Sequence, residues 1–246
     1  MKIVMNPAYA VLNKFIAEIP VRFEQEGELV YIARNQLRHY NVEGYDVIVK
    51  RYKKPHLINR VAYSFLRPSK AKRAYEYAFK LLELGLDSPA PIAYIEEYAC
   101  GLITYGYFIS IYEKDYSLIR ELMAGNQEDA SLLKALSLYI AELHLKGVLH
   151  LDMSPGNILY KKEGDKFHFT LIDINRMQFL SSVSKNRRYM SFKRLSENKE
   201  VLTSVAGLYA AAVGLNKTET IREINRYSLK FFSARKRSKP RKNGKS

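Results

Sequence analysis

The chain has 246 residues, 47% of them hydrophobic, which is enough to bury a core in one large domain or two smaller lobes. Lys and Arg outnumber Asp and Glu by 40 to 25, and the net charge of +15 favours polyanionic partners and disfavours cationic substrates. Cys100 is the single cysteine, which excludes an intramolecular disulfide and a thiolate metal cage.

The first half of the chain predicts a small antiparallel sheet with one helix. Alternating or β-branched runs indicate strands, and Asn41–Gly44 (NVEG) indicates a hairpin turn between two of them. Pro68 and Ser69 open a helix that Gly85 ends. The expected strands cover residues 28–33, 45–52, 92–95 and 107–112, and the expected helix covers residues 70–84.

The second half of the chain is predicted to be mainly helical. Residues 132–145 form an apolar helical segment that ends at Gly147, and residues 170–174 (TLIDI) indicate a short buried strand. Helices are expected from about residue 191 to 232, with Thr218 as the N-cap of the last one. We therefore predict a two-lobed α+β protein with an N-terminal lobe over residues 1–112 and a helical lobe over residues 113–232.

The last 14 residues, 233–246, form a basic tail that we expect to be disordered. The tail carries seven positive charges and no acidic residue. Such a segment attracts polyanions such as nucleic acid or an anionic membrane surface, or serves only to keep the protein soluble. The longest apolar stretch, Val205–Leu215, is far shorter than a bilayer span, so we expect a cytoplasmic protein, at most peripheral to the inner membrane.

The stretch HLDMSPGN, residues 150–157, carries the chemistry of a phosphoryl transfer site. Such a site needs a carboxylate that accepts the proton of the attacking hydroxyl, and oxygen ligands that hold Mg²⁺ against the nucleotide phosphates. Asp152 and Asn157 can supply the base and one metal ligand. Asp173, on the strand that follows, can supply the second metal ligand.

These residues resemble the signature of the protein-kinase-like superfamily, His-x-Asp followed by four residues and Asn. The resemblance implies a kinase fold with ATP and Mg²⁺, and it assigns Lys50 of VIVK to the nucleotide phosphates. It makes Glu76 the ion-pair partner of Lys50, although Lys72 and Lys80 leave an ordinary surface pair open. His150 is expected to organise the loop by hydrogen bonding, with Ser154 in support.

The sequence also departs from conventional protein kinases. Residues 33–37 (ARNQL) stand where a glycine-rich phosphate loop is expected, so Arg34 and Asn35 would have to cover the phosphates. Asn175 replaces the glycine of Asp-Phe-Gly, and only 73 residues follow Asp173. Over residues 25–180 the chain instead resembles the WaaP-like lipopolysaccharide kinases, which phosphorylate Kdo or heptose, and DINRM resembles their Asp-x-x-Arg ending.

This resemblance implies a kinase that transfers the γ-phosphoryl group of ATP to a sugar hydroxyl of an anionic glycolipid. Two alternatives remain open. DMSPGN is similar to the RIO kinases, and the positive charge would then serve ribosomal RNA. A pseudokinase scaffold on acidic surfaces is the other, although retention of Lys50, Asp152, Asn157 and Asp173 argues against it.

Overall fold

The computed structural model describes residues 1–126 and 129–238 and divides into two compact units. Unit 1 comprises Met1–Lys114 together with Asp173–Asn175, and unit 2 comprises Asp115–Ile172 and the residues from Arg176 onward. The division lies two residues beyond the lobe boundary predicted at residue 112. No local pattern in the sequence indicates that three residues from the second half of the chain belong to unit 1.

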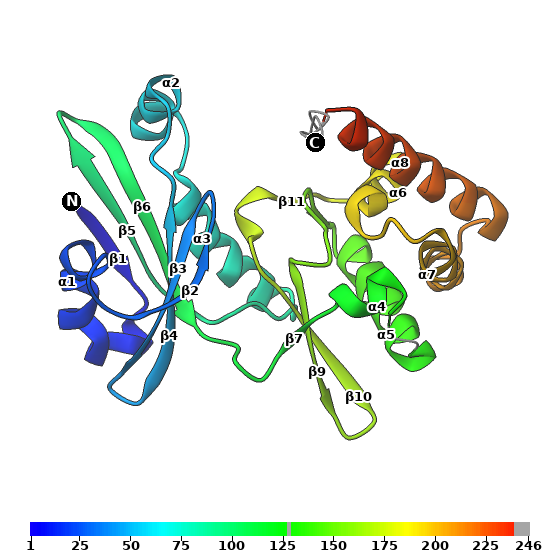
Figure 1. Ribbon diagram of the computed structural model, residues 1–246, viewed down its shortest axis with the longest axis horizontal. Helices are drawn as coiled ribbons and strands as arrows, with labels where there is room; N and C mark the ends of the chain where they lie inside the picture. Colours follow the sequence, from blue (N-terminus) through cyan, green and yellow to red (C-terminus); the bar gives the residue numbers. More distant parts are fainter. Residues whose placement is uncertain (127–128, 239–246) are drawn as a thin grey trace, which may run out of the picture. The chain divides into compact units, whose positions relative to one another are not determined.

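Unit 1 is built on a six-stranded antiparallel sheet in the order β1-β5-β6-β4-β3-β2 (Figure 1). The turn predicted at NVEG is present at Glu43 and Gly44, both with positive φ, but it joins β4 to β3, a strand that the sequence analysis did not predict, and not to the strand expected at residues 28–33. The strands are β1 (Lys2–Met5), β2 (Glu28–Ile32), β3 (Gln36–Val42), β4 (Tyr45–Tyr52), β5 (Pro91–Ala99) and β6 (Leu102–Ile111).

Helices cover both faces of this sheet. The predicted helix is α3 (Lys70–Glu83), which Ser69 caps by accepting from the Lys72 amide and which ends at Gly85 with a φ of 65°. The structure adds η1 (Pro7–Leu12), α1 (Asn13–Arg22), α2 (Leu57–Val61) and the π-helical turn η2 (Ala62–Leu66). Residues of α1 form one core with the buried face of β4 that carries Val47 and Val49.

Unit 2 is mainly helical, as predicted. Its helices are α4 (Arg120–Ala124), α5 (Ala130–Leu145), α6 (Lys185–Ser191), η4 (Phe192–Arg194), α7 (Lys199–Ala212) and α8 (Lys217–Ser238). Two small sheets accompany them, with the orders β10-β9-β7 and β11-β8. Their strands are β7 (Ser117–Leu118), β8 (Val148–His150), β9 (Ile158–Glu163), β10 (Lys166–Leu171) and β11 (Met177–Phe179).

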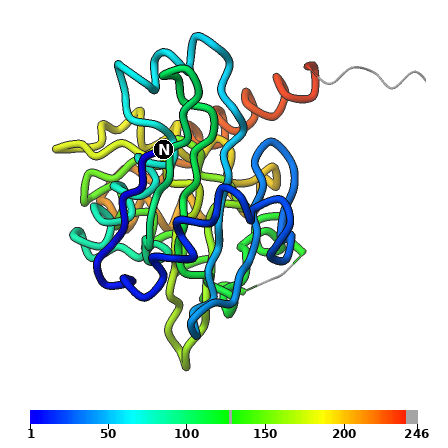
Figure 2. Tube along the Cα trace, turned by 90° about the vertical axis from the view of Figure 1, so that its left-hand side faces the viewer, coloured from blue at the N-terminus to red at the C-terminus, as the bar shows by residue number. Residues whose placement is uncertain are grey.

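The β9–β10 hairpin corrects one sequence prediction in unit 2. It projects as a narrow ribbon, yellow-green in Figures 1 and 2. The strand expected at residues 170–174 begins earlier, at Lys166, and ends at Leu171. The chain then enters the short 3-10 turn η3 (Ile174–Arg176) through Asp173, whose φ of 56° no strand residue adopts.

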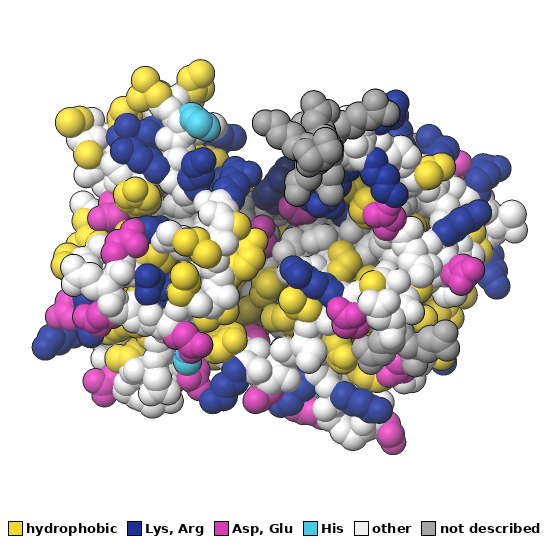
Figure 3. All heavy atoms as spheres, in the orientation of Figure 1, with side chains coloured by type: hydrophobic (Ala, Val, Ile, Leu, Met, Phe, Trp, Pro, Cys, Tyr) yellow, Lys and Arg dark blue, Asp and Glu magenta, His cyan; other side chains and the backbone are white. Residues whose placement is uncertain are grey.

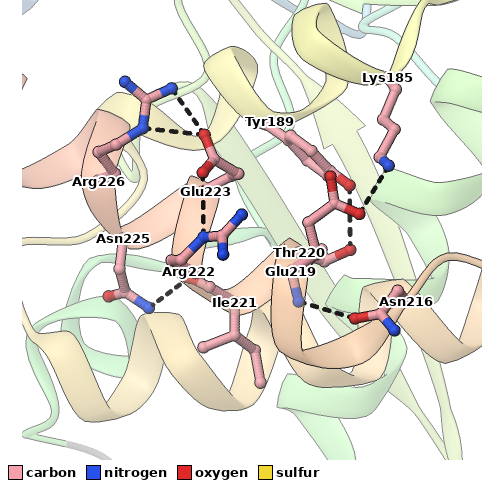
Figure 4. A network of polar contacts seen from close by, with 10 residues as sticks. All are labelled: Lys185, Tyr189, Asn216, Glu219, Thr220, Ile221, Arg222, Glu223, Asn225 and Arg226. Carbon is pink, nitrogen blue, oxygen red and sulfur yellow. Dashed lines mark hydrogen bonds and ion pairs between the residues drawn. The ribbon is translucent and has the colours of Figure 1, made fainter.

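Helix α8 corrects two further predictions. Its N-terminus is capped by Asn216, whose Oδ1 accepts from the Glu219 amide at 2.9 Å, and not by Thr218 (Figure 4). An ion pair of 2.7 Å between Lys185 and Glu219 ties α6 to the same turn (Figure 4). The helix continues through Ser238, so residues 233–238 of the predicted disordered tail are helical, and residues 239–246 lie outside the described residues.

A membrane-spanning helix is absent from the part of the chain that the structure describes, because no helix there combines the necessary length and apolar character.

Candidate active site

The loop that carries Asp152 is positioned by the turn at the end of α5. Gly147 follows the helix with a φ of 76°, and its carbonyl accepts from the Leu180 amide at 2.9 Å. A Cβ atom on Gly147 would lie 1.9 Å from the carbonyl oxygen of Leu180, so only glycine fits this close approach. The turn leads directly into β8, which pairs with β11 and ends at His150.

His150 braces the loop from beneath. Its ring is buried, Nδ1 accepts from the Asp152 amide at 3.1 Å, and Nε2 donates to the carbonyl oxygen of Ile172 at 3.2 Å. Both ring nitrogens therefore form hydrogen bonds with backbone atoms, which fits the neutral tautomer that carries its proton on Nε2. The contacts suit the loop-organising role that the sequence predicts, and they give His150 no part in proton transfer.

Asn157 closes the loop. Its Nδ2 donates to the carbonyl oxygen of Asp152 at 2.8 Å, and its own amide donates to the carbonyl oxygen of Ser154 at 2.9 Å. Ser154 thus supports the loop through its backbone. The first bond orients the side-chain amide so that its nitrogen faces the protein and its oxygen is the atom left to bind a cation. The Asp152 carboxylate stays partly accessible, with 16% of its side chain exposed.

Two arginines lie against the Asp152 carboxylate. One of them, Arg176, is the Arg of the Asp-x-x-Arg ending, and the other, Arg194, was not expected from the sequence. Arg194 of η4 forms a close ion pair with Oδ1, and Arg176 lies 3.9 Å from Oδ2. The Arg194 guanidinium also packs over the Phe231 ring, 5.2 Å from its centroid, which fixes its direction. The sequence feature that could have pointed to these arginines is the stretch from residue 174 to residue 196, which contains no acidic residue.

Unit 1 brings Lys50 and Asp173 together. Lys50 Nζ lies 2.6 Å from Asp173 Oδ1, although the two residues are 123 positions apart in the chain. Asn175 Nδ2 donates to the same oxygen at 2.7 Å, so the asparagine that replaces the kinase glycine holds the carboxylate. Beside them, burial raises the pKa of Tyr52 well above its ordinary value, and the Asp173 charge raises it further, so the phenol stays neutral.

Glu76 does not pair with Lys50, which corrects the predicted ion pair. It lies 3.6 Å from Lys72, one helical turn away, with 43% of its side chain exposed. This is the ordinary surface pair that the sequence left open, and its contribution to stability is small. The ammonium of Lys50 is directed to Asp173 instead.

The loop between β2 and β3 holds Arg34 and Asn35, which we predicted to cover the nucleotide phosphates. Asn35 Oδ1 accepts from the Lys53 amide at 3.2 Å, and its carbonyl accepts from the Ala33 amide at 3.1 Å, so this side chain braces the loop. Arg34 is exposed to solvent. A contact with nucleotide stays a prediction for both residues.

Each unit carries an oxygen donor of the kind that magnesium prefers. The Asp173 carboxylate and the Asn157 amide are hard oxygen donors, which Mg²⁺ prefers. Over residues 1–126 and 129–238 no group of three or more His, Cys, Asp or Glu side chains could hold a metal by itself.

Comparisons with known proteins identify the fold and the family of the chain. WaaP in complex with acyl carrier protein is a solved structure of similar fold, with a TM-score of 0.62 at 14% identity over 96% of this chain and 99% of that one. The predicted protein-kinase-like fold is therefore confirmed. No curated protein matches the sequence. The profile of the lipopolysaccharide kinase (Kdo/WaaP) family matches residues 33–205, well over half of the chain, and favours sugar phosphotransfer over the RIO-like alternative. The chain is a phosphotransferase and belongs to the lipopolysaccharide kinase (Kdo/WaaP) family.

Proposed function

We propose that this protein transfers the γ-phosphoryl group of ATP to a hydroxyl of a sugar in an anionic glycolipid, Kdo or heptose of the lipopolysaccharide inner core. The observation that carries the proposal is the setting of Asp152, a partly accessible carboxylate braced by His150 and paired with two guanidinium groups. A base in such surroundings suits an acceptor that brings its own negative charge.

The proposed nucleotide side of the reaction depends on Lys50 and Asp173. Lys50 would bind the phosphates, and Asp173 and Asn157 would supply oxygen ligands for Mg²⁺, which would neutralise phosphate charge. The Lys50–Asp173 pair supports this assignment, because an ammonium and a metal-binding carboxylate held 2.6 Å apart can both be placed against one triphosphate. Asn175 then keeps the carboxylate oriented.

The proposed acceptor side depends on Asp152, Arg176 and Arg194. Asp152 would accept the proton of the attacking hydroxyl. Arg194 would exchange its ion pair with Asp152 for one with the carboxylate or phosphate of the acceptor, since an arginine binds either group in a two-pronged contact. Acceptor binding would thereby free the base. Arg176 is mostly exposed and 3.9 Å away, so its pair with Asp152 is weak and easily replaced.

The test is an assay with labelled ATP and lipopolysaccharide precursors that carry Kdo or heptose, with mass spectrometry of the product. Asp152→Ala should abolish turnover and leave nucleotide binding intact, whereas Lys50→Ala and Asp173→Ala should also weaken binding of Mg²⁺ and ATP. Asp165→Ala and Lys14→Ala change exposed residues of the same types and should keep full activity.

Undiminished turnover in Asp152→Ala would exclude this residue as the base. Phosphorylation of ribosomal RNA–protein complexes and not of the glycolipid would favour the RIO-like alternative. A wild-type protein that binds the acidic acceptor but yields no ATP-dependent product would favour the scaffold.

A further inference from the structure

The segment between β4 and α3 turns its apolar side to solvent. Residues 57–66 form a continuous helical turn made of α2 and η2, and no residue of it is buried. Five large side chains on it have exposed fractions of 42% to 85%: Leu57, Ile58, Val61, Phe65 and Leu66. Hydrophobic atoms gather over α2 at the top of unit 1, with Lys and Arg beneath them (Figure 3). This apolar crown is an exposed patch of the kind that marks an interaction site.

The polar residues of the same segment anchor it to the sheet. Arg60 Nε donates to the Ile103 carbonyl of β6 at 2.8 Å, and Ser64 Oγ accepts from the Ile103 amide at 3.0 Å. Both views of the chain place α2 beside the tip of the β5–β6 hairpin (Figures 1 and 2). The usual amphipathic order is thus inverted, with hydrogen bonds inward and apolar side chains outward. Folding alone does not account for this arrangement, because the exposed apolar surface gives no burial energy.

A basic collar surrounds the crown. Residues 53–73 contain no Asp or Glu and seven basic residues, namely Lys53, Lys54, Arg60, Arg67, Lys70, Lys72 and Arg73. Lys53, Lys54 and Arg67 are exposed at the two ends of the helical turn. Arg67 is held in place by Asn59 at 2.6 Å and by the Tyr63 ring at 4.5 Å. Cations around protruding apolar side chains match a surface with negative headgroups above a hydrocarbon layer.

We propose that residues 53–67 dock on an anionic lipid bilayer, with Leu57, Ile58, Phe65 and Leu66 entering the interface and the exposed collar residues Lys53, Lys54 and Arg67 contacting headgroup phosphates. The partner is a membrane because the large apolar side chains protrude and the surrounding residues 53–73 are basic with no acidic residue, which suits a hydrocarbon layer under anionic headgroups. The proposal does not depend on the proposed kinase reaction, since its measurement is lipid binding. It assigns membrane contact to unit 1 and not to the basic tail.

The test compares binding of full-length variants to vesicles of phosphatidylcholine with and without phosphatidylglycerol. Changing Leu57, Ile58, Phe65 and Leu66 to Ser should lower the partition coefficient at least tenfold, because each large apolar side chain withdrawn from lipid costs about tenfold. Lys54→Glu should weaken binding only to the anionic vesicles and reduce its salt dependence. The matched controls Val21→Ser plus Leu229→Ser and Lys14→Glu alter equally exposed residues elsewhere and should bind normally.

Equal melting temperatures of the variants and the wild type establish that folding is unchanged. Wild-type affinity in the four-residue variant would overturn the proposal, as would loss of binding only when residues 239–246 are deleted. A wild-type protein that ignores both kinds of vesicle would also overturn it and point to a protein partner. If the variant instead changes the sedimentation mass and not the lipid affinity, the crown is a contact between two copies of the chain.

Discussion

Replacing Gly147 by alanine should destabilise unit 2 far more than the same change at Gly214. Both glycines have positive φ, 76° and 66°, and both follow a helix of unit 2. At Gly214 a Cβ atom meets nothing within 4 Å, so alanine there costs only the left-handed backbone conformation, about 1 kcal/mol. This variant is therefore the matched control for backbone strain.

At Gly147 the Cβ would lie 1.9 Å from the backbone oxygen of Leu180, and reaching even 3.0 Å requires a movement of 3.0 − 1.9 = 1.1 Å. A backbone shift of that size breaks the hydrogen bond from the Leu180 amide to Gly147, which costs about 1 kcal/mol, and strains the pairing of Phe179 with Val148. The strained pairing costs about 1 kcal/mol more, and with about 1 kcal/mol for the backbone conformation the total is about 3 kcal/mol.

Scanning calorimetry measures the difference. About 3 kcal/mol corresponds to a melting temperature lower by roughly 6 to 12 °C, against roughly 2 to 4 °C for Gly214→Ala. Activity should fall with Gly147→Ala even below the transition, because the displaced strand β8 carries His150 and, through it, Asp152. Equal shifts in the two variants would refute the reasoning from the close approach of Leu180.

Three further predictions concern single side chains. Asn175→Ala removes a hydrogen bond to Asp173 and should raise the Mg²⁺ concentration for half-maximal activity about fivefold. A titration of activity with Mg²⁺ measures this change, and an unchanged curve would show that Asn175 has no role in metal binding. Burial lowers the pKa of His144 to about 3, below its unfolded value. The free energy of unfolding should therefore fall as the pH drops below about 6.5, by about 2 kcal/mol at pH 5. Chemical denaturation at several pH values should show this dependence in the wild type and not in His144→Gln. Arg194→Gln should raise KM for the acidic acceptor at least tenfold and leave KM for ATP unchanged, and steady-state kinetics with an equal rise in both would contradict an acceptor role.

The sequence predicts those parts of the fold and site that local patterns encode. The ends of α3 follow from Ser69 and Gly85, because a cap needs only nearby residues. The distant pair of Lys50 and Asp173 was accessible only through the kinase resemblance, since no spacing rule joins residues so far apart. Glu76 shows the opposite case, where a local partner, Lys72, takes the side chain that the resemblance assigned to Lys50.

The features that sequence reasoning missed depend on tertiary packing. Arg194 reaches Asp152 only because η4 packs next to α8, where Phe231 supports its guanidinium. The sequence did not predict the exposed crown on α2, because the spacing of its apolar residues is the same as in a buried helix. Such a pattern does not determine whether the apolar side faces the protein or the solvent. Asn216 caps α8 in place of Thr218 because the helix starts at Lys217, two residues earlier than a cap at Thr218 allows.

The buried side chain of Asn175 has a consequence for regulation. Conventional kinases are switched by reorienting the segment that carries their metal-binding aspartate, and a glycine two residues later makes such rotation easy. Here an asparagine bonded to that aspartate occupies the position, and turning the segment would break the bond and expose a polar group. The bond therefore favours a single orientation of Asp173, and we expect the flux of the proposed reaction to follow the supply of its acceptor and not a signal that turns this segment.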